Sequence, residues 1–174
     1  MMLPTFIAII AISALIIVWA IATQRKLVVL DENTRSDMIQ IGVQLSSRFT
    51  SLNILLDLTK EYTIQESETL IESITAKRNM ITANSTVDEV IRQERIISDV
   101  LERIGMIMAR YPELKNDQYF VKTMNAAETF EAMMRTTRLI YNSNVTKLNR
   151  EVRIFPTSMI AGMIGILQKE YLEE

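Results

Sequence analysis

An uninterrupted apolar run from Leu3 to Ala22 limits how this chain can fold more than any other feature of its sequence. The run has no charged side chain, and its only hydroxyl groups belong to Thr5 and Ser13. A helix of about 20 residues is about 30 Å long, which matches the hydrocarbon core of a bilayer. Trp19 lies near the far end of the run, where a tryptophan suits the headgroup boundary. The run predicts a transmembrane anchor over residues 1–23.

A cleaved signal peptide is the alternative to this anchor, because Ala20-Ile21-Ala22 resembles a cleavage site. Signal peptides carry Lys or Arg before their apolar core, and this chain has neither there, so the anchor is favoured. Arg25 and Lys26 follow the run directly. Under the positive-inside rule they predict a single-pass protein whose N-terminus is outside and whose remaining chain is in the cytoplasm.

The residues after the anchor are poor in helix breakers, since the whole chain has only 4 Gly and 3 Pro. Apolar residues recur there at spacings of three and four, which is the pattern of helices packed on one another. Short connections make successive helices antiparallel neighbours. The predicted fold is all-α: the transmembrane helix continues into a long, coiled-coil-like antiparallel four-helix bundle over residues 24–156.

The ends of the four helices are predicted from capping residues and prolines. The expected ranges are 24–62, 63–83, 87–111 and 117–155. Thr63 is expected to cap the second helix, with Glu66 completing a capping box. The polar stretch 84–86 is expected to cap the third helix with a Ser or Thr. Pro112 and Pro156 are expected to stop the third and fourth helices.

Residues 157–174 form an apolar tail. The fourth helix is expected to run back toward the membrane and to bring this tail to the membrane side. Its uncharged part, Met159 to Leu167, is too short to span a bilayer. Three placements stay open: on lipid or the anchor, as a cap on the bundle's end, or in a contact between subunits. Ala161 and Gly165 are expected to permit close backbone approach. The full set of predicted tail-packing residues is Phe155, Pro156, Ala161, Gly162 and Gly165.

Basic residues on both sides of the bundle are expected to meet at the membrane surface. They are Arg25, Lys26, Lys147, Arg150 and Arg153, and they are called the basic collar below. A basic residue near an anionic leaflet contributes about 1 kcal/mol to membrane binding. The collar therefore predicts the lipid bilayer as a partner.

Polar residues interrupt the apolar seam, meaning the helix face that packs against the other helices. The predicted seam polar network contains Arg48, Glu94, Glu131, Arg138, Asn142 and Asn149. Buried charges must be paired, and a paired network sets helix register. Partial exposure of the seam and catalysis are the alternatives. The chain has no His and no Cys, which removes the commonest general base and metal ligands. We predict no enzyme, no cofactor and no metal.

Several stretches together carry a family resemblance: "YPELKNDQYF" at 111–120, "RLIYNSNVTKLNREVRIFP" at 138–156, and the closing "AGMIG" and "EYLEE". On these residues the chain resembles the LemA family of bacterial membrane proteins. It departs from the family where "SLNILLD" lacks a proline and where Ser47-Arg48 replaces two basic residues. The resemblance implies an antiparallel four-helix bundle at the bacterial cytoplasmic membrane. Some relatives belong to membrane compartments such as magnetosomes, which implies a structural role.

Two functions are consistent with these observations. The first is a non-enzymatic membrane-anchored scaffold that forms a homo-oligomer or docks protein partners at the cytoplasmic membrane face. The alternative is an accessory subunit of a membrane signalling or transport system. A net charge of −2 disfavours nucleic acid as a partner.

Overall fold

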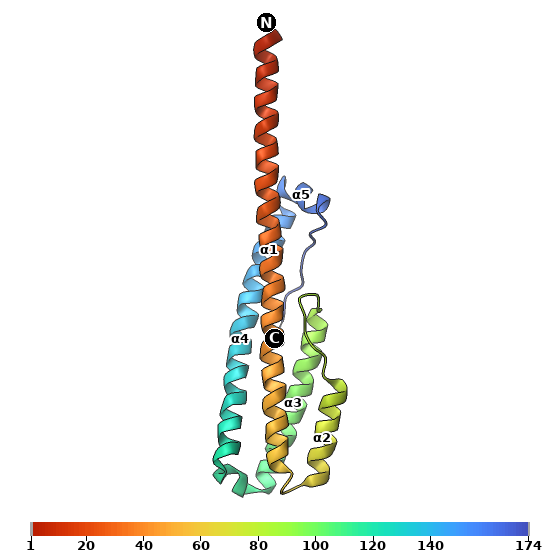
Figure 1. Cartoon of the computed structure of the whole chain (residues 1–174), viewed down its shortest axis with the longest axis vertical. Helices are drawn as coiled ribbons and strands as arrows, with labels where there is room; N and C mark the ends of the chain where they lie inside the picture. The colour runs from red at the N-terminus through yellow and green to blue at the C-terminus, as the bar shows by residue number, and fades with distance from the viewer. Residues whose placement is uncertain (1, 174) are drawn as a thin grey trace. The chain divides into compact units, whose positions relative to one another are not determined.

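The structure, a computed structural model, describes residues 2–173, and every regular element in that range is helical. This confirms the predicted all-α class and its long apolar first helix. The elements in order are α1 (Met2–Thr59), α2 (Ile64–Lys77), α3 (Val87–Arg110), the 3-10 helix η1 (Pro112–Asn116), α4 (Gln118–Arg153) and α5 (Thr157–Met163) (Figure 1). The chain divides into two compact units, one of residues 1–35 and 141–174, the other of residues 36–140.

The anchor region of α1 has no protein neighbour along most of its length. All side chains from Thr5 to Trp19 are exposed, and burial begins at Thr23 and Leu27. The bare part of the helix therefore ends where the apolar run ends. By length and composition, α1 is the one helix among the described residues that could cross a membrane.

The unit of residues 36–140 has a core made by all four of its long helical segments. Most of its buried side chains lie at the three- and four-residue spacing on which the helix prediction rests. Those of α1 are Met38, Ile41, Leu45, Phe49, Leu52, Leu55 and Leu56; those of the other helices include Leu70, Ile74, Val90, Ile97, Ile104, Phe120, Ala127 and Met134.

α2 is shorter than expected, because it ends at Lys77 and not near Ala83. The buried side chain of Gln93, on α3, satisfies its end: it accepts a hydrogen bond from Asn79 N at 2.9 Å and donates to the Lys77 carbonyl at 3.2 Å. Arg78 is already extended, with a ψ of 122°. The helix therefore stops because a distant side chain replaces its next turn.

The predicted capping box at the start of α2 is also wrong. Thr63 makes no capping hydrogen bond, and its hydroxyl donates to the Glu66 carboxylate at 3.3 Å. A complete capping box is found one helix later. There Glu89 N donates to Thr86 Oγ1 at 3.2 Å, and Thr86 N donates to Glu89 Oε2 at 2.9 Å. This confirms the predicted cap within residues 84–86.

The unit of residues 1–35 and 141–174 has a smaller core. Its buried apolar side chains come from α1, from the end of α4 and from the tail, and they are Leu27, Tyr141, Val145, Leu148, Ala161 and Leu172. α4 ends at Arg153, two residues before the predicted end, and α5 occupies the start of the tail. Beyond α5 the chain continues to residue 173 without regular structure.

Candidate functional site

Two asparagines of α4 hold the end of the tail against that helix. The Asn149 side chain accepts from Lys169 N at 2.8 Å and donates to the Lys169 carbonyl at 2.9 Å. Asn142 makes the same pair of bonds to Leu172, both at 2.9 Å. Each side-chain amide therefore pairs with one residue of the tail through both of that residue's backbone groups. We call these four residues the tail clasp.

The spacing of the clasp follows from backbone geometry. Asn142 and Asn149 are seven residues apart, which corresponds to a rise of about 10.5 Å along an α-helix. Lys169 and Leu172 are three residues apart, which corresponds to about 10 Å in an extended chain. The two asparagines also lie on the same helix face, since seven residues make nearly two full turns. Two amides on a helix can therefore bind two residues of an extended segment in register.

Further contacts support the clasp. The Tyr141 hydroxyl donates to the Glu170 carbonyl at 3.1 Å, and Lys169 Nζ lies 3.0 Å from Asp31 Oδ1 on α1. The Leu172 side chain is buried, with an exposed fraction of 1%. Both asparagines were predicted to belong to the seam polar network, and their partners in the tail were not predicted. Only the closing "EYLEE", which carries part of the family resemblance, marked the end of the tail as a feature of interest.

The two glycines of the tail have no close neighbour of the kind that the predicted packing requires, whereas Ala161 is buried. Gly165 has a φ of 72°, and a Cβ at Gly162 or Gly165 would meet no atom within 4 Å. Ile166 N donates to the Ala161 carbonyl at 3.1 Å, which together with the positive φ gives the Schellman pattern of a helix end. Gly165 therefore ends α5 and turns the chain toward the clasp.

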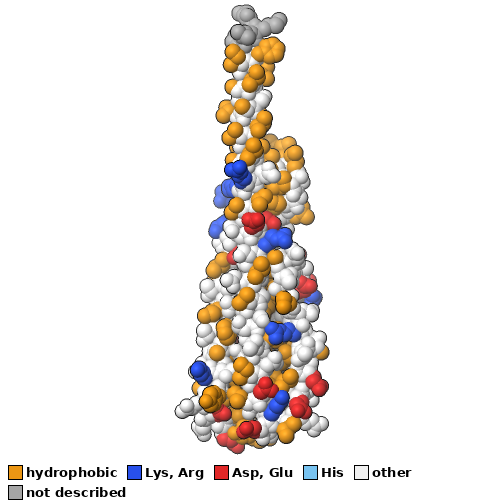
Figure 2. Space-filling model, viewed as in Figure 1, with side chains coloured by type: hydrophobic (Ala, Val, Ile, Leu, Met, Phe, Trp, Pro, Cys, Tyr) orange, Lys and Arg blue, Asp and Glu red, His pale blue; other side chains and the backbone are white. Residues whose placement is uncertain are grey.

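Several apolar side chains around α5 are exposed. They are Ile154, Phe155, Met159, Met163 and Leu167, whereas Ala161 is buried. Figure 2 shows the orange apolar side chains of this region beside the base of the apolar part of α1, near blue basic side chains. Pro156 follows Phe155 through a cis peptide bond in the turn between α4 and α5. The tail thus presents apolar side chains at the level where the apolar run ends.

The basic collar residues do not all have the same surroundings. Lys26 pairs with Glu151 at 2.7 Å, and Lys147 donates to Asn144 Oδ1 at 3.2 Å. Arg150 and Arg153 are exposed and line one pocket, together with Thr146, Asn149, Ile154 and Tyr171. Its volume is about 430 Å³. Arg25 is exposed and lies outside this pocket.

The four seam charges of residues 36–140 lie near one another as two ion pairs. Arg138 pairs with Glu94, and both side chains are less than one fifth exposed. Arg48 is 3.7 Å from Glu131, which also pairs with Arg135 at 2.8 Å. Burial lowers the pKa of the Arg48 guanidinium, and the carboxylates of Glu131 and Glu94 partly offset this shift by raising the pKa. The chemistry of the group is therefore mutual charge compensation.

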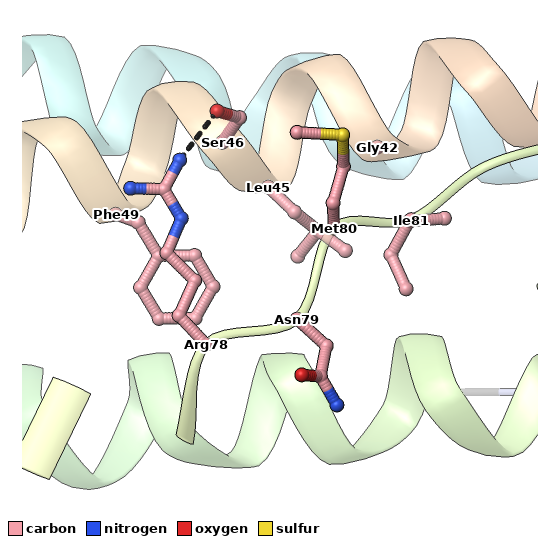
Figure 3. Close-up of a pocket in the computed structure, with 8 residues that line it drawn as sticks. All are labelled: Gly42, Leu45, Ser46, Phe49, Arg78, Asn79, Met80 and Ile81. Carbon is pink, nitrogen blue, oxygen red and sulfur yellow. Dashed lines mark hydrogen bonds between the residues drawn. The ribbon is translucent and has the colours of Figure 1, made fainter. Parts of the chain in front are cut away.

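A small cavity lies where the chain leaves α2 and passes over α1 (Figure 3). Its volume is about 220 Å³, and Arg78 crosses it, donating to Ser46 Oγ at 2.7 Å with its guanidinium 5.4 Å from the centre of the Phe49 ring. A Cβ on Gly42 would approach the Ile81 carbonyl oxygen to 2.5 Å. Glycine is therefore required for this close passage, and Arg78 is already engaged within the protein.

No cluster of three or more His, Cys, Asp or Glu side chains that could hold a metal ion occurs in residues 2–173. The absence of a cofactor and of catalysis stays a prediction from the sequence.

The fold and these sites define an all-helical protein with one apolar N-terminal helix and a tail bound to its last long helix. The chain belongs to the LemA family, whose model matches residues 37–174. The match begins after the apolar run and includes the whole tail clasp. A search of curated proteins found no match to this chain.

Proposed function

We propose that this protein is a non-enzymatic, membrane-anchored helical scaffold that self-associates at the cytoplasmic face of the bacterial inner membrane. The observation that carries the proposal is the exposure of every side chain from Thr5 to Trp19 on a helix long enough to span a bilayer. A bare apolar helix of this length needs lipid or another apolar helix around it. The exposed apolar side chains around α5 give the tail a second contact with the same surroundings.

The proposal includes an antiparallel four-helix bundle over the part of the chain that follows the anchor. Contacts within residues 36–140 support it. Thr59 Oγ1 and Ser67 Oγ, 2.9 Å apart, join α1 to α2, and Gln93 joins α3 to the end of α2. The ion pairs of Arg48 with Glu131 and of Arg138 with Glu94 connect α4 to α1 and α3. Such a bundle is a rigid body suited to lateral contacts.

A stripe on α1 is the proposed surface for self-association. Ile39, Val43 and Ile54 are each about half exposed, and the positions between them on this helix face are Ser46, Ser47 and Thr50. The stripe itself has no charged side chain over about four turns of a solvent-facing helix, and Arg78 reaches its edge at Ser46. Anchored copies share one orientation in the membrane, which brings like faces together side by side. We propose a second copy of this chain as the occupant of the stripe.

This surface can be tested with the variant Ile39→Gln/Val43→Gln, in the full chain extracted into mild detergent. We expect native mass spectrometry to show a defined oligomer for the wild type and a rise in its dissociation constant on the order of tenfold or more for the variant. The matched control is Met80→Gln/Met106→Gln, which also replaces two exposed apolar side chains and should leave the oligomer intact. A wild type that remains a single copy with a stoichiometric second protein would favour the accessory-subunit alternative.

The topology has its own test, because the chain has no Cys and one engineered thiol is unique. We expect Glu113→Cys, at an exposed position of η1, to react with a membrane-impermeant maleimide only after the cells are permeabilised. A cysteine added before Met1 should react in intact cells and serves as the control. The reverse pattern would place the bundle outside the cytoplasm and contradict the charge argument.

A further inference from the structure

We infer that the pocket lined by Arg150 and Arg153 binds the phosphate of an anionic phospholipid headgroup. Neither guanidinium forms an ion pair with an acidic side chain in the described part of the chain. The neighbouring carboxylate of Glu151 is already bound to Lys26 at 2.7 Å. Two uncompensated positive charges that line one pocket attract an anion, and guanidinium groups match phosphate oxygens in bidentate geometry.

The pocket also offers hydroxyl groups. Thr146 Oγ1 donates its only proton to the Asn142 carbonyl at 2.8 Å and lies 3.4 Å from the Tyr171 hydroxyl oxygen. The Tyr171 hydroxyl can donate its proton either to Thr146 Oγ1 or to a ligand in the pocket. Asn149 forms a fixed wall, since its side-chain amide is held by two hydrogen bonds in the tail clasp. The clasp thus holds Tyr171 over α4 and completes the pocket.

The height of the pocket favours a lipid over a free anion. This step rests on the membrane anchoring proposed above. The Lys26–Glu151 pair sets the two helices level with one another, and the end of α4 leads to α5 beside the base of the apolar run (Figure 1). Counting along the helices, Arg153 and Arg150 lie about 3 and 8 Å below the level of Ala22. The headgroup layer on each side of a bilayer is about 5–8 Å thick, so both guanidinium groups reach its phosphates.

The pocket is polar on one side and apolar on the side toward the membrane, as the headgroup and acyl chains of a lipid require. Thr146, Asn149 and Tyr171 supply its polar side, and Ile154 lines its membrane-proximal side. The exposed Phe155 follows directly. A phospholipid bound with its phosphate on the arginines would place its glycerol and upper acyl carbons against Ile154. A free phosphate ion would gain nothing from that apolar wall.

The test uses the full chain in neutral detergent at physiological salt, with native mass spectrometry of bound phosphatidylglycerol or phosphatidylcholine. We expect one tightly held phosphatidylglycerol per chain, weaker phosphatidylcholine, and an affinity about 30-fold lower in Arg150→Gln/Arg153→Gln. The matched control, Arg25→Gln/Lys147→Gln, removes the same charge from the collar outside the pocket. It should lower the affinity less than about threefold, because neither side chain lines the pocket and neither guanidinium that would hold the phosphate is changed.

Three outcomes would overturn the inference. Equal loss in the two double variants would mean that only collar charge matters, which leaves the membrane-docking proposal standing. Equal binding of the two lipids by the wild type would remove the anionic site, and displacement by millimolar inorganic phosphate would make it a free-anion site. If Arg150→Gln/Arg153→Gln does not fold, Arg150→Lys/Arg153→Lys keeps the charge and should still weaken binding severalfold, because lysine lacks the bidentate fork.

Discussion

Replacing Asn149 by alanine is expected to release the end of the tail from α4. The side chain has an exposed fraction of 8%, and both of its hydrogen bonds go to the backbone of Lys169. Their loss removes two bonds of about 1 kcal/mol each and leaves two partly buried backbone groups unpaired. We expect the exchange protection of the backbone amides of Lys169 and Leu172 to fall about 30-fold or more, which corresponds to roughly 2 kcal/mol.

The clasp can be separated from general effects of mutation on α4. Asn125→Ala, at an exposed position of the same helix, should leave the protection of both amides unchanged. Asn149→Asp should cost nearly as much as alanine, because a carboxylate cannot donate to the Lys169 carbonyl. In the background of Asn149→Ala, the further change Asn142→Ala should lower the amide protection of Leu172 less than Asn142→Ala does alone, because the segment is already loosened. Full protection in Asn149→Ala would show that the buried Leu172 side chain alone holds the tail.

The second large effect is expected at the Glu94–Arg138 pair. Arg138→Leu leaves the Glu94 carboxylate, which is only 18% exposed, without its partner. We expect a loss of roughly 2–4 kcal/mol in the free energy of unfolding, because an unpaired charge in a poorly hydrated site is costly. Glu94→Leu/Arg138→Leu should be more stable than Arg138→Leu. Chemical denaturation followed by circular dichroism measures both.

A pair of double-mutant cycles tests which acidic side chain interacts with Arg138. Glu131 belongs to the same predicted seam network as Arg138, but it lies against Arg48 and Arg135. The coupling free energy should exceed about 1 kcal/mol for Glu94 with Arg138 and stay below about 0.5 kcal/mol for Glu131 with Arg138. Equal coupling of both acids would mean that the four seam charges act as one delocalised group and not as two pairs.

The helices were predictable from local patterns, and their partners were not. Apolar spacing identified the buried face of α1 from Met38 to Leu56, and Thr86 with Glu89 marked the start of α3. The end of α2 had no local signal, because no Gly or Pro lies between Lys77 and Ala83 and its cap comes from Gln93, on the next helix. Thr63 and Glu66 had the capping pattern, yet their side chains bind each other.

In the candidate sites, too, the unusual residues were predictable from the sequence and their partners were not. The sequence identified Asn142 and Asn149 as unusual in a helix, since asparagine is a mediocre helix former. Their partners are backbone groups at Lys169 and Leu172, which carry no side-chain signature. Tyr171 and Thr146 were missed as members of the arginine pocket for a related reason. Tyr171 meets Arg150 and Arg153 only after Gly165 has turned the chain back, and Thr146, one turn before Arg150 on α4, becomes part of a pocket only when Tyr171 lies over it.

The tail clasp also limits how this part of the protein can change in length during evolution. One residue inserted between Asn142 and Asn149 would rotate one amide by about 100° around α4 and take it away from the tail. One residue inserted between Lys169 and Leu172 would shift the second pairing by about 3.4 Å along the tail and take it out of register with Asn142. The helix and the tail can lengthen together only in matched steps of about seven and three residues. Substitutions can accumulate between the paired positions, but single insertions and deletions cannot.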